Sequence, residues 1–179
     1  NEVLHVGTLR LSRLKFLLDV GRRFLRHRPS WSWSFIGMHD AVLDWFRRHV
    51  TGYWARRIHG HGRIPHTEVP ERLCRARIAV NYHALDNRQI RVAIPLKVFE
   101  YLACGLPVVT TRVPLLVELV ADCPAVQLTD DDGGAYLEAL ERLADAADAD
   151  ELSRQARRFS DERFTCRREA ERLSRLYRH

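Results

Sequence analysis

The fold of this chain is decided by the stretch Ile94-Pro95-Leu96-Lys97-Val98-Phe99-Glu100-Tyr101-Leu102-Ala103-Cys104-Gly105-Leu106-Pro107-Val108-Val109. Its first half has the composition of a short helix over about 96–104, and Gly105 is suited to end that helix. A valine-rich strand is expected to follow at once, over 107–110. A helix that leads directly into a buried strand is the repeating unit of α/β proteins.

The same alternation of strand and helix continues in both directions from this stretch. Strands are expected at 3–6, 33–36, 56–59, 78–82, 107–110 and 125–128, and helices at 11–27, 41–49, 68–75, 96–104 and 114–120. We expect a polar loop at 83–94, a turn at 130–134, and two or three amphipathic helices over 135–177. Gly60 and Gly62 are expected to close the third strand.

Several strands are continuous apolar runs, which is typical of a parallel sheet covered by helices on both faces. The sequence therefore predicts an α/β fold: a Rossmann-like, doubly wound parallel sheet of about six strands with extra C-terminal helices. Residues 1–179 are expected to form a single domain. The chain begins at Asn1 with a strand already under way, so we expect it to be a fragment of a longer protein.

The basic residues favour an anionic partner. The net charge is +6, and Lys15 and Lys97 are the only lysines among 29 basic residues. Nucleic acid is not an expected partner, because Arg22-Arg23 and Arg47-Arg48 lie on helical segments without interleaved aromatic residues. A peripheral membrane surface is a further expected contact. No apolar run reaches the roughly 20 residues that span a bilayer.

Neither the cysteines nor the histidines predict a cofactor. The four cysteines form no Cys-x-x-Cys pair, so we expect reduced thiols and a cytoplasmic location, on the inner face of a membrane if one is bound. Cys74 and Cys104 are expected to behave as small buried hydrophobes. His59, His61 and His66 alternate without a nearby carboxylate, so no metal is expected.

Loops at the carboxyl ends of parallel strands are where ligands bind in such folds. Gly7 ends the first strand and allows a close approach to the backbone, while Arg10 and Arg13 follow it. The loop after the fourth strand contains His83, Asp86 and Asn87, polar side chains that can bind a sugar. A plain turn and a solvated connection are the alternatives for these two loops.

The helix that begins near Leu96 offers a third site. Free N–H groups of Leu96, Lys97 and Val98 and the ammonium group of Lys97 would attract phosphate. Glu100 lies one turn further on, where its carboxylate can accept hydrogen bonds from the vicinal hydroxyls of a ribose. The alternative is that Glu100 only favours the helix dipole and that Lys97 faces solvent.

Together these segments resemble the C-terminal donor-binding domain of glycosyltransferases with the GT-B fold, most of all glycosyltransferase family four. The resemblance covers nearly the whole chain. It is carried by Val6-Gly7, by the second strand within 28–37, by His59-Gly60-His61-Gly62-Arg63-Ile64-Pro65, by 76–81 and by the opening stretch.

The residues at these loops and the resemblance together give each candidate an expected role. Gly7, Thr8, Arg13, Arg63, Ile64, Leu96, Lys97, Val98 and Glu100 would bind the nucleotide, His83, Asp86 and Asn87 the sugar, and Lys97 and Arg10 would act in catalysis. Glu100 matches the second of two family glutamates, which binds ribose, while Val92 stands at the position of the first. The family's basic residue after the first glycine is Thr8 here, so Arg10, Arg13 or Lys15 would have to replace it.

The implied activity is transfer of a sugar from a UDP- or GDP-sugar to an acceptor hydroxyl, in polysaccharide or glycolipid synthesis and without a metal or other cofactor. An N-terminal acceptor-binding domain would complete the enzyme. Three alternatives stay open. The missing first glutamate favours a non-catalytic nucleotide-binding module, while Val92 argues against a sugar-nucleotide epimerase-like domain of the same fold, which needs acid/base residues facing the sugar. The third alternative is a basic protein that binds nucleic acid or lipid.

Overall fold

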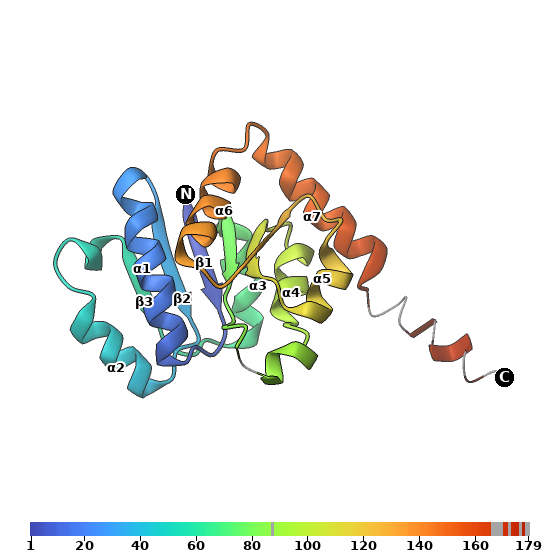
Figure 1. Ribbon diagram of the computed structural model, residues 1–179, viewed down its shortest axis with the longest axis horizontal. Helices are drawn as coiled ribbons and strands as arrows, with labels where there is room; N and C mark the ends of the chain where they lie inside the picture. Colours follow the sequence, from blue (N-terminus) through green and yellow to red (C-terminus); the bar gives the residue numbers. More distant parts are fainter. Residues whose placement is uncertain (87, 166–169, 172, 176, 178–179) are drawn as a thin grey trace.

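Six parallel strands form one sheet in the computed structural model, which describes residues 1–86, 88–165, 170–171, 173–175 and 177 (Figure 1). The spatial order of the strands is β3-β2-β1-β4-β5-β6, so the predicted Rossmann-like, doubly wound sheet is confirmed. The strands are β1 (Glu2–Val6), β2 (Ser32–Ile36), β3 (Ile58–His61), β4 (Ile78–Asn81), β5 (Val108–Thr111) and β6 (Val126–Thr129).

Helices cover both faces of the sheet. They are α1 (Leu11–His27), α2 (Asp40–His49), α3 (Val69–Arg75), α4 (Lys97–Ala103), α5 (Pro114–Val120), α6 (Gly133–Ala144) and α7 (Ala149–Arg163), with 3-10 turns η1 (Trp54–Arg56), η2 (His66–Glu68) and η3 (Arg88–Val92). Successive strand residues point to opposite faces, so Val3 packs with α1, α2 and α6, while Leu4 packs with α3, α4, α5 and α7. None of the helices among these described residues is long and apolar enough to cross a membrane.

The third strand lies further along the chain than predicted. Arg56 belongs to η1, and β3 runs over Ile58–His61 because it pairs with β2 from Trp33↔Ile58 to Ile36↔His61. Gly60 therefore does not close the strand but lies inside it. A Cβ atom at Gly60 would lie 2.5 Å from a ring carbon of Phe46, so the glycine makes room for α2.

The other corrections concern segments rich in polar residues. The predicted turn at 130–134 ends earlier, because the Asp132 carboxylate accepts hydrogen bonds from the N–H groups of Gly134 (2.8 Å) and Ala135 (2.9 Å) and caps α6 from Gly133 onward. The predicted loop at 83–94 contains η3. Cys74 is exposed, not buried, since it lies on the outer side of the short helix α3, and Cys104 is partly buried.

The order of the strands places the site. The chain builds β1, β2 and β3 outward in one direction and then returns to add β4, β5 and β6 on the other side of β1. The connections that leave β1 and β4 therefore diverge to opposite faces and open a crevice between them. The residues that follow β1, together with the start of α4, lie at this crevice.

Candidate functional site

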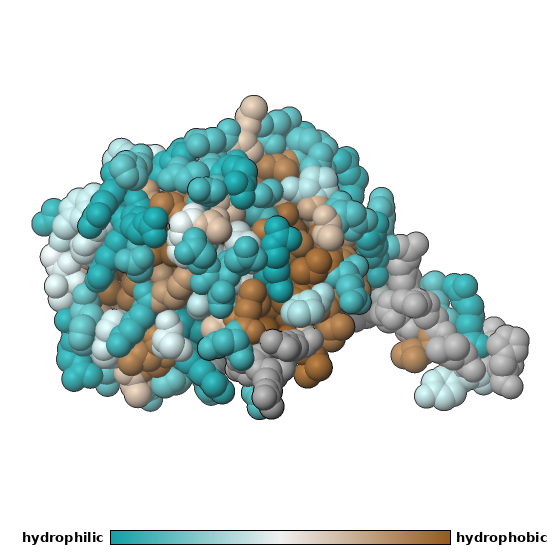
Figure 2. Space-filling view, viewed as in Figure 1, coloured by the Kyte–Doolittle hydropathy of each residue, from teal (hydrophilic) through white to brown (hydrophobic). Residues whose placement is uncertain are grey.

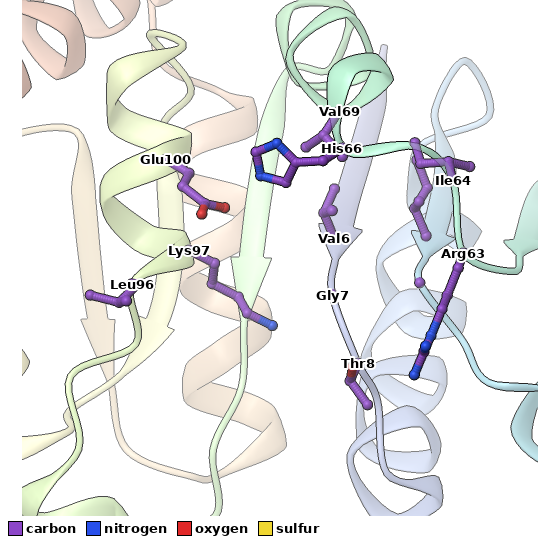
Figure 3. Close-up of a pocket in the computed structure, with 12 residues that line it drawn as sticks. Val6, Gly7, Thr8, Arg63, Ile64, His66, Val69, Leu96, Lys97 and Glu100 are labelled. Carbon is purple, nitrogen blue, oxygen red and sulfur yellow. The ribbon is translucent and has the colours of Figure 1, made fainter.

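A cavity of about 460 Å³ lies at the carboxyl end of β1 (Figure 3). It is lined by residues from four separate parts of the chain: Val6, Gly7, Thr8, Ile36, Gly37, Arg63, Ile64, His66, Val69, Leu96, Lys97 and Glu100. Seven of the nine residues that were expected to bind a nucleotide are among them. Tertiary structure thus brings together segments about 90 residues apart, and the cavity is comparable in volume to those that hold small-molecule ligands.

Gly7 forms the floor of the cavity, and its backbone conformation requires glycine. Its φ angle is 118°, and its N–H donates to the carbonyl oxygen of Ile36 at 2.8 Å. A Cβ atom at Gly7 would lie 2.6 Å from Nζ of Lys97. Gly37 also has a positive φ angle, 98°, and a Cβ atom there would lie 3.0 Å from the carbonyl carbon of Gly7. The bare backbone here leaves room for a ligand beside the lysine.

Lys97 is the first residue of α4, and its ammonium group points across the cavity toward Gly7 (Figure 3). The side chain is largely buried and does not face solvent. The pKa of Lys97 is lowered to about 8, chiefly by burial and also by the positive charge of Arg13, while Glu100 acts in the opposite direction. A buried cation that lacks a close carboxylate partner is suited to bind an anionic ligand.

Glu100 lies one turn along α4 from Lys97, and its carboxylate points into the cavity (Figure 3). The carboxylate is exposed and forms no ion pair with a described side chain. On the opposite wall, His66 and Val69 come from η2 and α3, and Arg63 and Ile64 from the segment before η2. No pattern in the sequence indicates Val69, and the sequence suggests His66 only as a metal ligand.

The N–H groups at the start of α4 are not all free, although the sequence predicts that they are. The N–H of Val98 already donates to the carbonyl oxygen of Pro95 at 3.1 Å, and the Val98 side chain is fully buried in the core. The N–H of Phe99 is likewise bonded to Leu96 at 3.0 Å. Leu96 lines the cavity with 70% of its side chain exposed. The positive charge at this edge therefore comes mainly from the Lys97 ammonium group.

A buried tyrosine that sequence reasoning missed holds α4 against β1. The Tyr101 hydroxyl accepts a hydrogen bond from the N–H of Val6 at 3.0 Å and donates to the carbonyl oxygen of the same residue at 3.0 Å. Both bonds lie immediately before Gly7. Burial raises the pKa of the Tyr101 hydroxyl well above its usual range, so it stays protonated. Its position inside an apolar helix offered no signal of this role.

Arg10, Arg13 and Asp86 line a second, smaller cavity of about 290 Å³, together with Ser12, Tyr82 and Ala84. This cavity lies between the start of α1 and the segment after β4. Arg13 is close enough to lower the pKa of both Lys97 and His83, so the two cavities share one region of positive potential. Asn87, also expected at the sugar, lies outside the described residues.

His83 is buried at the end of β4, and no described group bonds to either of its ring nitrogens. Its backbone N–H donates to the Thr111 hydroxyl at 3.0 Å, which fixes its position. The pKa of His83 is lowered to about 4, chiefly by burial and also by the positive charges of Arg13 and Lys97, so the ring is neutral at pH 7. A neutral imidazole without a partner can both donate to and accept from a ligand.

Neither an acid in place of the family's first glutamate nor a metal site is present in the described part of the chain. Val92, at the position of the family's first glutamate, is 77% exposed in η3, so the segment after β4 offers no acid there. Among the described residues, no group of three histidine, cysteine or acidic side chains could hold a metal ion. His59, His61 and His66 are not brought together in such a group.

The chain resembles known proteins in both sequence and fold. Residues 23–175 match the family described as "Glycosyl transferase-like". The solved structure of TarM superposes with a TM-score of 0.76 at 14% identity, over 99% of this chain and 35% of that one. The pneumococcal O-GlcNAc transferase GtfA, solved with UDP and GlcNAc, gives a TM-score of 0.72 at 13% identity, over 97% and 35%.

A separate C-terminal domain gives a closer match in size. The C-terminal domain of LpcC, a group 1 family glycosyl transferase from Francisella tularensis, has a TM-score of 0.73 at 14% identity, over 92% of this chain and 86% of that domain. The chain thus spans about a third of TarM and GtfA and most of an isolated C-terminal domain. No curated protein matches the chain in sequence. With the fold of a GT-B C-terminal domain and a family match over residues 23–175, the chain belongs to the glycosyl transferase-like family.

Proposed function

We propose that the 460 Å³ cavity binds the nucleotide of a UDP- or GDP-sugar, and that the chain is the donor-binding part of a two-domain glycosyltransferase. The observation that carries this proposal is the arrangement of α4. One helix places a buried ammonium group beside the bare backbone of Gly7 and, one turn away, an unpaired carboxylate. This pair fits a diphosphate next to a ribose.

In this proposal the nucleotide lies across the cavity. The diphosphate lies over Gly7 and Thr8, where Lys97 donates to it. Glu100 accepts hydrogen bonds from the two ribose hydroxyls, and the base lies against Arg63 and Ile64 on the opposite wall. A diphosphate at Gly7 would also reach the positive potential of Arg13.

The chemistry is a substitution at the anomeric carbon of the donor. The bond from that carbon to the distal phosphate oxygen breaks, and this oxygen leaves with the nucleoside diphosphate. A bond to the acceptor oxygen forms, and the acceptor proton passes to a base that the N-terminal domain would supply. Lys97, with Arg10 and Arg13, would stabilise the negative charge that accumulates on the departing diphosphate. His83, Asp86 and Asn87 would contact the sugar. This scheme needs no metal and no other cofactor.

The remainder of the enzyme would be an N-terminal domain that holds the acceptor, in keeping with the share of TarM and GtfA that this chain spans. We propose a cytoplasmic enzyme of polysaccharide or glycolipid synthesis. By itself the chain would bind nucleotide and turn over slowly or not at all. The exposed Val92 leaves the contact of the family's first glutamate unfilled.

Isothermal titration of the chain with UDP, GDP and UMP tests the proposal. We expect UDP or GDP to bind, UMP to bind about tenfold or more weakly, and Lys97→Ala to remove the preference for the diphosphate, since a charge-assisted hydrogen bond contributes about 1.5–3 kcal/mol. Glu100→Ala should weaken binding of the ribonucleotide but not of its 2′-deoxy form to the same extent.

Glu118→Ala is the matched control, because Glu118 is an exposed glutamate on α5. If a folded chain binds neither UDP nor GDP, the donor site is refuted. If nucleotide binds but Glu100→Ala behaves like Glu118→Ala, the assigned ribose contact is wrong. A non-catalytic module would bind nucleotide yet give no transfer when joined to its N-terminal domain.

A further inference from the structure

The positive charge of the chain is concentrated in one segment. Residues 10–57 contain 11 of the 29 basic residues but only 3 of the 23 acidic ones, a net charge of +8 in a chain whose net charge is +6. This segment forms α1, β2, α2 and η1, which lie together at one end of the molecule (Figure 1). Charge gathered on one side indicates an anionic partner.

The arginines of this segment are presented on the outer sides of α1 and α2. Arg47 and Arg48 are exposed near the end of α2, and Arg23 is 42% exposed on α1. The acids nearby pair with them only weakly: Asp19 lies 3.9 Å from Arg23 and Asp44 lies 3.7 Å from Arg47, both in solvent. The charge of Arg23 also acts on the exposed Asp132 carboxylate, next to α6. Exposed, weakly paired arginines leave a persistent positive potential over both helices.

Aromatic side chains lie among these cations, which corrects the expectation from sequence that none would. Lys15 Nζ is 5.4 Å from the ring centroid of Trp45, and the Arg22 guanidinium is 6.0 Å from that of Trp54. Tyr53, beside Trp54, is 58% exposed. The rings come from α2 and η1 and the cations above them from α1, so the three elements form one continuous surface.

We propose that this surface, the basic face, binds a membrane that contains anionic lipids. The basic face consists of Lys15, Arg22, Arg23, Arg47, Arg48 and Arg56 with Trp45, Tyr53 and Trp54. In the view of Figure 2 this end is mainly hydrophilic, with pale side chains of intermediate hydropathy among the charged ones. Arginine beside tryptophan and tyrosine suits the headgroup region, where amphipathic rings and cations meet both water and lipid.

A lipid surface fits better than a nucleic acid. Lys15 lies over the ring of Trp45, which also stacks on His49 with ring centroids 4.0 Å apart, and Arg22 lies over the ring of Trp54, so neither tryptophan is an open platform on which bases could stack. The basic face also shares no residue with the 460 Å³ cavity, so a membrane-bound chain keeps that cavity open. Membrane binding and nucleotide binding are thus separable by mutation.

Co-sedimentation of the chain with vesicles tests this proposal. We expect binding to phosphatidylcholine vesicles that contain about 30% phosphatidylglycerol and little binding to phosphatidylcholine alone. Arg47→Ala/Arg48→Ala should lower the partition coefficient about twenty-fivefold, at about fivefold for each arginine near the surface. The control is Arg157→Ala/Arg158→Ala, an exposed adjacent pair on α7 that removes the same charge.

The outcomes separate the proposal from its rivals. A control pair that loses as much vesicle binding as the α2 pair would refute a located surface and leave only net charge. Failure of the unmutated chain to sediment with anionic vesicles would refute membrane binding, and if single-stranded DNA were bound through Arg47 and Arg48 instead, the face would be a nucleic-acid site. UDP titration of each variant checks folding, and an unchanged affinity is expected.

Discussion

Replacing Lys97 with methionine is expected to stabilise the folded chain while weakening nucleotide binding. The pKa of Lys97 is lowered from 10.5 to about 8, chiefly because the charged form is buried. At pH 7 the amine is charged in both the folded and the unfolded chain, so folding carries the full cost of that burial. The difference in pKa corresponds to about 3 kcal/mol, at about 1.4 kcal/mol for each unit.

Burying Lys97 makes the stability of the folded chain depend on pH. Because the folded pKa is depressed, the unfolded chain binds more protons between pH 8 and 10.5, and stability rises with pH across that window. Methionine keeps the apolar stem and removes the charge. At pH 7 the free energy of unfolding of the variant should therefore be about 3 kcal/mol higher than that of the unmutated chain. This difference should fall to roughly half by pH 9.5.

Urea unfolding followed by circular dichroism at both pH values measures the free energy of unfolding, and titration with UDP measures nucleotide affinity. We expect a loss of about tenfold or more in UDP affinity, the value of one charge-assisted hydrogen bond. Lys15→Met is the control: Lys15 is exposed over Trp45, so its effect on the free energy of unfolding should stay below about 1 kcal/mol. A Lys97→Met chain no more stable than the unmutated one at pH 7 would refute the reasoning.

The remaining predictions concern the frame of the site. Gly7→Ala should lower the free energy of unfolding because a φ angle of 118° is strained for alanine, and should lower UDP affinity because its Cβ would displace Lys97 Nζ, which lies 2.6 Å away. Gly52→Ala, in open space, should cost only about 1–2 kcal/mol of backbone strain. Tyr101→Phe should cost about 1–3 kcal/mol in urea unfolding by leaving the Val6 N–H without its partner. Burial depresses the pKa of His83 to about 4, so stability that is complete above pH 6.5 should be lost as pH falls toward 4; His83→Asn should flatten that loss in urea unfolding at pH 7 and 5, and an equally steep loss would contradict it.

The sequence predicted the sheet well because its signals are local. Short runs, most of them apolar and several bounded by glycine or proline, indicated where the six strands lie, although the third was placed two residues too early; helix α1 was placed at both of its ends. Prediction failed where a distant contact decides the outcome. Gly60 looked like a strand end but lies inside β3, since only Phe46 and Met38 packing above it explain the missing side chain.

The sequence by itself determined the chemical content of the site: a lysine and a glutamate three positions apart at the start of a helix, and a glycine at the end of a strand. That much follows from spacing along a few residues, which local backbone geometry controls. It could not determine how charged Lys97 remains, because a pKa depends on burial and on neighbours such as Arg13 that are far away in the chain.

Only the tertiary structure decided what these residues face. The reversal of strand order beside β1 brings α4 to Gly7, and the Tyr101 hydroxyl holds it there through two hydrogen bonds to Val6. The same packing buries the Val98 side chain in the core, although the sequence predicts Val98 at the phosphate site. Contacts between segments about 90 residues apart depend on the strand order and on side chains filling the space between layers, which no local pattern specifies.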